Sequence, residues 1–256
     1  MKILVCVKQV PDTESLIVID QSGRWIETAS LVFHMNRYDE YAVEEALLIK
    51  ETVQRTVVDA LSVGPARVRN VIKRALEMGA DNGIHIALPE ERYYDPLTIA
   101  SLIRRYAHDQ GYDLILCGIM AEDDLQSQVG PMLAEMLGIP CATSVISQRL
   151  ADDLTRISVE REIEGGERER FELALPALLA VQSGMNRPRY PALSNVLRAK
   201  RQELITIDVG DMPHTQGQAS ITLRYPEHSQ RGVLLSGSMR EKAQALLRIL
   251  HAHAFL

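Results

Sequence analysis

The sequence has few cysteines and no long apolar run. Three cysteines occur among 256 residues, at positions 6, 117 and 141, so their spacing indicates neither a disulfide framework nor a Cys-x-x-Cys metal site. No stretch approaches the roughly 18 consecutive apolar residues of a membrane span. Lys8, Asp12 and Glu14 interrupt the apolar start before the core of a signal peptide could form. We therefore predict a cytoplasmic protein without a membrane span.

An excess of positive charge is also lacking. Lys and Arg number 28 against 34 Asp and Glu, which gives a formal net charge of −6. General nucleic-acid binding needs a basic domain, so this balance argues against that class of partner. With 46% hydrophobic and 24% charged residues, the chain can bury the core of one large domain or two small ones.

Motifs of covalent, metal and phosphate-transfer chemistry are absent from the sequence. There is no G-x-G-x-x-G after the first apolar run, no G-x-x-x-x-G-K-[ST], no G-x-S-x-G and no H-E-x-x-H. The seven histidines are scattered along the chain. We therefore expect no catalytic residue and no metal site, and we do not predict an enzyme.

Short apolar runs alternate with amphipathic helical patterns through the first two thirds of the chain. Continuous apolar runs are typical of parallel strands buried on both faces. Their alternation with helices of ten or more residues indicates βαβ units. We predict an α/β fold with a Rossmann-like open parallel sheet and helices on both faces. The expected strands are 3–7, 57–63, 84–87, 113–117 and 177–181, and the expected helices are 39–50, 65–78, 96–108, 127–137 and 196–201.

The pattern changes after residue 140. Residues 154–163 and 168–175 flank Gly165-Gly166 and predict a protruding β-hairpin with Glu and Arg alternating on its solvent face. Residues 210–237 are rich in Gly, Pro, Gln and Ser, and 239–250 predict an amphipathic helix whose apolar face must dock on something. We divide the chain into an α/β nucleotide-binding domain at 1–208 and an extended arm with a C-terminal helix at 209–256.

A candidate binding site follows from the position of residues 116–134. This segment lies where the predicted strand 113–117 ends and a helix begins, and open α/β sheets bind ligands outside the carboxyl ends of their strands. Residues 127–130 would present first-turn N–H groups to a phosphate. Asp123 or Asp124 either caps this helix or accepts a hydrogen bond from ribose or adenine.

Two other loops leave the same sheet edge. Residues 8–13 follow the first strand, and residues 34–39 precede the first helix. Asn36 or Asp39 could simply cap that helix. If these residues do more than cap, they belong to the same site.

Five segments carry a resemblance to a known family. They are ILVCVKQVPDT at 3–13, MNRYDEYAVEEAL at 35–47, GIMAEDDLQSQVGPMLAEMLGIP at 118–140, VEREIEGG at 159–166 and NRPRYPALSNVLRAKR at 186–201. Each segment alone is a weak signal, whereas five in order over residues 1 to about 208 are specific. The chain resembles the β-subunit of electron-transfer flavoproteins, in the family that includes FixA-type proteins.

The resemblance implies a heterodimer with a larger α-subunit that holds the redox-active FAD, while the β-subunit binds AMP in a structural role. The resemblance assigns the AMP contacts to loops that also form the binding site predicted at the carboxyl ends of the strands. These residues are Cys6, Asn36, Arg37, Tyr38, Asp39, Val63, Asp123, Asp124, Leu125, Gln126, Ser127, Gln128, Val129, Gly130, Pro131, Met132, Leu133 and Ala134.

The resemblance also implies two contacts with protein partners. Residues 187–201 resemble a recognition loop for partner dehydrogenases, on which Leu193 would enter an apolar pocket. The basic residues near it would form a rim that steers the approach; they are Arg187, Arg189, Arg198, Lys200 and Arg201. In the hairpin, Glu169 is the candidate to meet an arginine of the α-subunit near the flavin. Glu167 is the alternative, because this segment carries one extra residue. Thr13 stands where many members carry a tyrosine beside the flavin.

The nucleotide is the point of largest departure from the family pattern. Electron-bifurcating members bind a second FAD in place of AMP, and KQVPDT and QVGP in this chain are similar to their motifs. However, Asp124 stands where those members have glycine, and NRYD replaces their NPDD. Because a side chain at position 124 would crowd a larger ligand, we predict AMP, with a second FAD as the alternative.

The resemblance therefore predicts the β-subunit of an electron carrier. It would take electrons from acyl-CoA or related dehydrogenases of fatty acid oxidation and pass them towards a quinone oxidoreductase, while residues 209–256 wrap the α-subunit. The chain would supply docking and orientation, because the redox chemistry belongs to the flavin. The alternatives are a subunit of a bifurcating, NADH-linked oxidoreductase and a stand-alone adenine-nucleotide-binding protein. Against the latter, no Gly-rich loop for a triphosphate is present.

Overall fold

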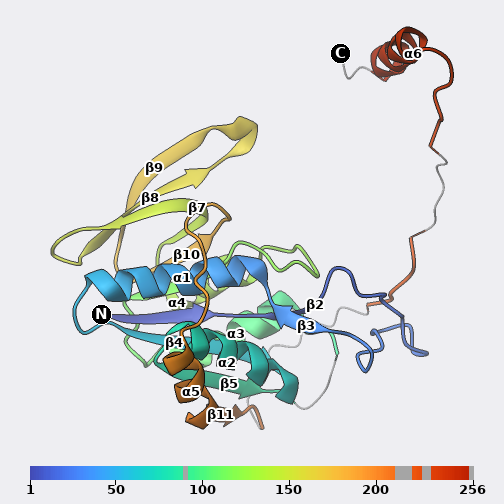
Figure 1. Cartoon of the computed structure of the whole chain (residues 1–256). Coiled ribbons are helices and arrows are strands. Elements are labelled where there is room, and N and C mark those ends of the chain that lie inside the picture. The colour runs from blue at the N-terminus through green and yellow to red at the C-terminus, as the bar shows by residue number, and fades with distance from the viewer. Residues whose placement is uncertain (89–91, 211–220, 227–231, 254–256) are drawn as a thin grey trace. The chain divides into compact units, whose positions relative to one another are not determined.

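A nine-stranded sheet forms the centre of the computed structural model, which describes residues 1–88, 92–210, 221–226 and 232–253 (Figure 1). Its strands are β1 (Lys2–Cys6), β4 (Val57–Gly64), β5 (Asn82–Ala87), β6 (Leu114–Gly118), β7 (Cys141–Leu150), β8 (Arg156–Glu162), β9 (Arg168–Ala174), β10 (Ala177–Val181) and β11 (Ile205–Asp208). The order is β11-β5-β4-β1-β6-β10-β7-β8-β9, parallel from β11 to β7 and antiparallel beyond. The prediction of an open, mostly parallel sheet is confirmed.

Helices cover both faces of this sheet, as predicted. One core layer lies beneath α1 (Arg37–Thr52), α2 (Arg69–Met78) and α5 (Leu193–Arg201), and the other beneath α3 (Pro96–Ala107) and α4 (Val129–Leu137). Local signals in the sequence set several boundaries. The Asp95 side chain accepts the Thr98 N–H and starts α3, a short 3₁₀ turn (Ala66–Val68) follows Pro65 before α2, and Gly138 ends α4 with φ 68°.

Four helix starts differ from the sequence prediction. Helix α2 begins at Arg69, after the 3₁₀ turn, and not at residue 65. Helix α1 begins at Arg37 and α5 at Leu193, both earlier than expected, whereas α4 begins only at Val129. Ser127, with φ 54°, therefore lies before α4 and not in its first turn. Leu193 lies at the first position of a helix and not within a loop.

Four strands were not predicted. Strands β2 (Gln9–Pro11) and β3 (Phe33–Met35) form a short antiparallel pair outside the main sheet, and β11 adds a parallel edge strand beside β5. Strand β7 pairs with β10 on one side and β8 on the other, and its register shifts between Val145 and Ser147. Because Ser144 has φ 57°, the alternation of faces breaks there and leaves no period-two pattern in the sequence.

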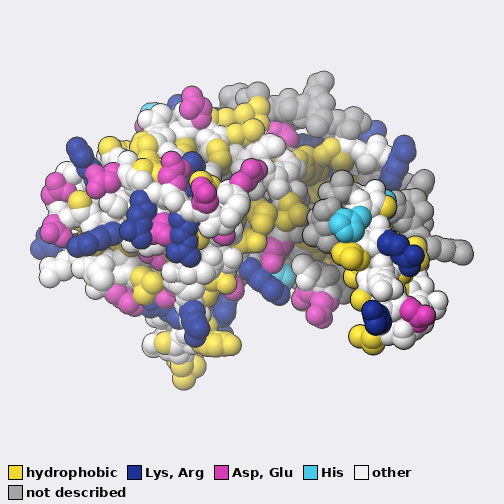
Figure 2. All heavy atoms as spheres, turned by 90° about the horizontal axis from the view of Figure 1, so that it is seen from above, with side chains coloured by type: hydrophobic (Ala, Val, Ile, Leu, Met, Phe, Trp, Pro, Cys, Tyr) yellow, Lys and Arg dark blue, Asp and Glu magenta, His cyan; other side chains and the backbone are white. Residues whose placement is uncertain are grey.

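The predicted hairpin is formed by β8 and β9, which turn through a 3₁₀ segment (Glu164–Gly166) with positive φ at Gly165 and Gly166. It projects from the body in Figure 1 and continues the sheet through β7. Cross-strand ion pairs cover it: Glu160 binds Arg168 and Arg170, and Arg161 binds Glu169. From above, basic and acidic side chains are interleaved across this face (Figure 2).

The chain divides into two units, Met1–Thr222 and Leu223–Leu256. In the second unit, α6 (Met239–Ala252) confirms the predicted C-terminal helix and starts at a capping box of Ser238 and Glu241. Much of the predicted extended segment 210–237 lies outside the described residues. None of the described helices is long and apolar enough to cross a membrane.

The strand order places a topological switch point between β1 and β6. From β1 the chain proceeds to β4 and β5 on one side, and then crosses to β6 and β10 on the other. Connections on the two sides run to opposite faces, and open α/β sheets bind their ligands at such a point, outside the carboxyl ends of the central strands. The loops after β1 and β6 therefore meet at this point.

Candidate functional site

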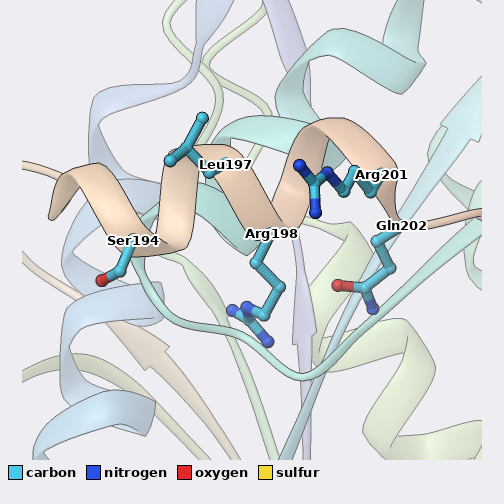
Figure 3. A pocket seen from close by; sticks show the side chains of 5 residues that line it. All are labelled: Ser194, Leu197, Arg198, Arg201 and Gln202. Carbon is cyan, nitrogen blue, oxygen red and sulfur yellow. The ribbon is translucent and has the colours of Figure 1, made fainter.

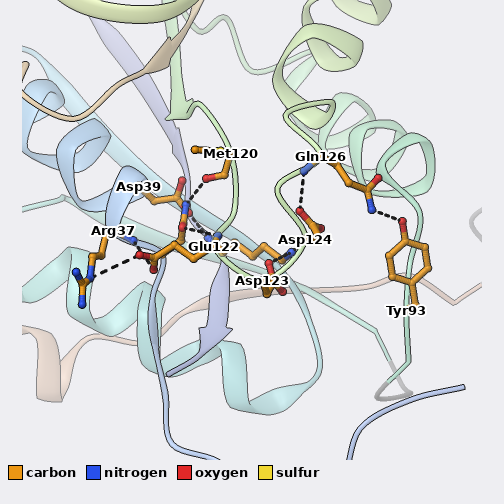
Figure 4. Close-up of polar contacts among 10 residues, drawn as sticks. Arg37, Asp39, Tyr93, Met120, Glu122, Asp123, Asp124 and Gln126 are labelled. Atoms are coloured by element: carbon orange, nitrogen blue, oxygen red, sulfur yellow. Dashed lines mark hydrogen bonds and ion pairs between the residues drawn. The ribbon is translucent and has the colours of Figure 1, made fainter. Parts of the chain in front are cut away.

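The loops at the switch point are joined by Asp39, in the first turn of α1. This buried carboxylate accepts the Lys8 N–H after β1 at 2.7 Å and the Gly118 N–H at the end of β6 at 2.9 Å. Figure 4 shows Asp39 beside Met120 and Glu122 of the loop after β6. A Cβ added at Gly118 would lie 2.5 Å from both Asp39 Oδ1 and Tyr38 Cβ. Asp39 thus joins three elements that are far apart in the sequence, and Gly118 permits their close approach.

Asn36 holds the loop after β6 against the start of α1. Its side chain donates to the Met120 carbonyl at 2.9 Å and accepts the Glu122 N–H at 3.2 Å. Although Asn36 occupies the N-cap position, it makes no side-chain capping bond. The alternative in which Asn36 or Asp39 merely caps this helix is therefore wrong.

Lys8 binds the two aspartates of the loop. Its Nζ lies 2.7 Å from Asp123 Oδ1 and 2.9 Å from Asp124 Oδ2, and these two carboxylates raise the Lys8 pKa against the effect of burial. Neither aspartate caps α4, whose N-cap residue is Gln128. The capping alternative is wrong here too, because both carboxylates turn towards the loop after β1.

Glu122 adds a third carboxylate with its own partners. His34 Nε2 lies 3.3 Å from Glu122 Oε2, and Arg37 Nε lies 3.6 Å from Glu122 Oε1. Arg37 is otherwise largely exposed. The loop thus carries three carboxylates against two permanent cations, Lys8 and Arg37, so its charge is slightly negative.

The remainder of the loop presents polar groups at the start of α4. Gln126 Nε2 donates to the Tyr93 hydroxyl at 2.7 Å, and Leu125 and Ser127 have positive φ. Gln128 makes no side-chain capping bond, so no side chain at this position caps the first turn. Groups at a helix N-terminus attract anions through their N–H donors and the helix dipole.

The other predicted contacts lie deeper. Cys6 is buried at the end of β1, half-buried Val63 packs against the same core layer near the end of β4, and Leu133 and Ala134 are buried on α4. Burial raises the pKa of Cys6 to about 12, so its thiol stays protonated near neutral pH. The nucleotide contacts assigned to these residues, and to all the other residues of the predicted site, remain predictions.

Burial also raises the pKa of Asp39 to about 7, despite the two backbone hydrogen bonds that lower it. Because the folded state then holds this proton more tightly than the unfolded state, its stabilising contribution is complete below pH 4 and is lost as the pH rises through 7. We expect the free energy of unfolding to fall by about 2.5 kcal/mol from pH 5 to 8. Urea titrations at several pH values should show that the free energy of unfolding falls less steeply with pH in Asp39→Asn than in the wild type. Identical slopes would contradict the raised pKa of Asp39.

A second candidate site surrounds Leu193. The docking segment, defined as residues 186–193, carries Tyr190 and Leu193 with 93% and 73% of their surfaces exposed. A hollow of about 590 Å³ follows it along α5, lined by Ser194, Leu197, Arg198, Arg201 and Gln202 (Figure 3). An apolar tip beside basic side chains suits contact with a partner protein.

The two hairpin glutamates differ in their surroundings. Glu169 is bound by Arg161, with Nη2 2.7 Å from its Oε2. Glu167 is exposed at the turn and makes no ion pair within the described part of the chain. Of the two, Glu167 can therefore meet an external cation without breaking an existing pair.

Several residues of the first site were not singled out from the sequence. Lys8, Glu122 and Tyr93 each hold the loop after β6, and Gly118 sets the closeness of α1. The position of Lys8 directly after the first strand was an available signal. The role of Tyr93 could not be inferred from the sequence, because its partner Gln126 lies 33 residues later in the chain.

Comparisons with known proteins agree with the resemblance found in the sequence. The family model of the electron transfer flavoprotein domain matches residues 25–212. An electron transfer flavoprotein subunit beta from Bacillus subtilis is 34% identical over 266 aligned positions, covering 99% of both chains. Proteins of the same name from Bos taurus and Homo sapiens are each 37% identical over 214 positions, covering 83% of both chains.

Proposed function

The chain belongs to the electron transfer flavoprotein family as a β-subunit, and we propose that it binds AMP structurally and assembles with a FAD-bearing α-subunit. The carrier would accept electrons from acyl-CoA or related dehydrogenases and deliver them to a quinone oxidoreductase. The observation that carries the proposal is the meeting of loops at the switch point, where Asp39, Asn36 and Lys8 hold them together. FAD supplies the redox chemistry when bound; the residues of this chain bind, orient and dock.

The donors at the switch point suit a single phosphate. The first turn of α4 has no side-chain cap at Gln128 and offers N–H donors, and Lys8 supplies an ammonium group nearby. However, two aspartates already bind Lys8, and Glu122 adds a further negative charge. Each added phosphate therefore meets more repulsion, which favours a monophosphate over the pyrophosphate of a second FAD.

The nucleotide content of the purified complex tests this proposal. We expect acid denaturation of the heterodimer, co-expressed with its α-subunit, to release FAD and AMP in a ratio of about one to one. Chromatography with authentic standards measures both. Two FAD per heterodimer without AMP would instead establish the bifurcating type and contradict the interpretation of Asp124.

Two features support binding to the α-subunit. Helix α6 exposes Leu246, Leu247 and Ile249, and none of its described residues is buried. An amphipathic helix with this composition gains stability by covering its apolar side with a partner. In the hairpin, we propose Glu167 as the residue that meets a cation of the α-subunit, with Glu169 held by Arg161.

The docking segment supports binding of a dehydrogenase. Leu193 is exposed at the first turn of α5, and Arg187, Lys200 and Arg201 are exposed with no ion pair among the described residues. An exposed apolar anchor gives affinity, and basic side chains around it raise the association rate with an acidic partner.

Leu193→Ala is expected to weaken docking without affecting assembly. Removal of a central apolar anchor costs about 2 kcal/mol of binding free energy, which corresponds to roughly a thirtyfold rise in the Michaelis constant for the dehydrogenase. Steady-state transfer from a reduced acyl-CoA dehydrogenase to the heterodimer measures this constant. FAD content and elution volume serve as controls, and unchanged kinetics would remove the anchor role.

A further inference from the structure

We propose that Arg189 and Glu44 form a clamp that positions the docking segment for its partner. The inference rests on the proposed docking function and adds a positioning residue to it. Arg189 directly precedes Tyr190 and lies four residues before Leu193. Its role is therefore to orient the exposed side chains and not to contact the partner.

The contacts of Arg189 with Glu44 are numerous and partly buried. The Glu44 side chain is only 5% exposed, on the middle of α1. Its Oε1 accepts from Arg189 Nη2 at 2.8 Å, and its Oε2 accepts from Nε at 2.9 Å and from the Arg189 backbone N–H at 3.0 Å. Arg189 Nη1 also lies 2.6 Å from Glu51 Oε1. This bidentate geometry fixes both the side chain and the backbone at position 189.

Asn186 fastens the beginning of the docking segment to the same helix. Its Nδ2 donates to the Tyr41 carbonyl at 3.0 Å and to Glu45 Oε2 at 2.9 Å. Glu45 is itself buried and accepts from Gln148 Nε2 at 2.8 Å. Two adjacent glutamates of α1 thus hold two positions of the segment.

The helix that follows the segment is held separately. Arg198 Nη2 donates to the carbonyls of Leu76 and Ala80, at 3.0 and 2.9 Å, at the end of α2. The stretch that carries Tyr190 and Leu193 is therefore fixed on both sides while its own side chains remain exposed. A surface that is already ordered loses less conformational entropy when it binds.

These contacts separate the basic residues near Leu193 into two groups. Arg189 and Arg198 are committed to contacts inside the molecule. Arg187, Lys200 and Arg201 are exposed, with no ion pair within the described ranges. Substitution of the first group should change the order of the segment, whereas substitution of the second should change the salt dependence of association.

Amide hydrogen exchange of the heterodimer tests the clamp without any partner. We expect Arg189→Gln to speed exchange of the amides in 187–193 by about tenfold. Arg189→Lys should restore part of the protection, because it keeps the charge but loses the bidentate contact. Arg105→Gln, at an exposed arginine on α3, is the matched control and should leave these amides unchanged.

Transfer kinetics then distinguish positioning from a merely structural role. We expect Arg189→Gln to raise the Michaelis constant for a reduced acyl-CoA dehydrogenase about tenfold at unchanged kcat. Unchanged exchange in 187–193 would overturn the clamp, and faster exchange with an unchanged Michaelis constant would overturn its role in docking. If Leu193→Ala also leaves the Michaelis constant unchanged, the proposed docking function itself is wrong. If Arg189→Gln leaves it unchanged but Leu193→Ala raises it, only the inference about Arg189 is wrong.

Discussion

Gly118→Ala is expected to destabilise the fold by about 3 kcal/mol and to release the proposed AMP from the heterodimer. The added Cβ would lie 2.9 Å from the Tyr38 backbone carbon and 2.5 Å from Asp39 Oδ1, distances that real Cβ atoms do not tolerate. Because a backbone atom is involved, a side-chain rotation cannot relieve the overlap. The start of α1 must move away from β6, which stretches the bonds that Asp39 makes to both loops.

The urea midpoint and the AMP released per heterodimer measure this effect. Gly232→Ala is a suitable control, since a Cβ there meets nothing within 4 Å and its φ is not in the left-handed region. A variant at Gly118 with wild-type stability and full AMP content would show that the close approach of α1 is unimportant.

The sequence was sufficient for the parallel part of the sheet because its strands are buried on both faces. Runs such as 3–7 and 114–117 are continuously apolar, and each is followed by residues that form an amphipathic helix. Strand β7 lacks such a signal, since it changes partners along its length and bends at Ser144. Strand β11 is a short edge strand of mostly exposed residues, so no burial pattern marks it.

The candidate site was predictable in position but not in its contacts. The placement of a loop after a central strand follows from topology, and the sequence places residues 116–134 there. The pairing of Lys8 with Asp123 and Asp124 spans more than 110 residues, and local rules offered helix capping as an equally good explanation for both aspartates. Similarly, Arg189 was interpreted as part of a steering rim, because its partner Glu44 lies 145 residues earlier.

Asp39→Ala is expected to be the most damaging single substitution for the nucleotide site. It leaves the N–H groups of Lys8 and Gly118 without their acceptor and creates a cavity at the start of α1. An unsatisfied buried donor costs about 1–3 kcal/mol, so the two together should lower the free energy of unfolding by roughly 4 kcal/mol. The loops after β1 and β6 would then separate, because the Asp39 carboxylate accepts a backbone N–H from each of them.

AMP content and urea midpoint again provide the measurement, with Asp109→Ala as the matched control at a largely exposed carboxylate. We expect Asp39→Ala to lose AMP even where it folds, and Asp109→Ala to retain it. Retention of AMP by a folded Asp39→Ala heterodimer would show that the loops are ordered by other contacts, such as those of Asn36 with Met120 and Glu122. Loss of AMP from the Asn36→Ala variant alone would then identify Asn36 as the residue that organises these loops.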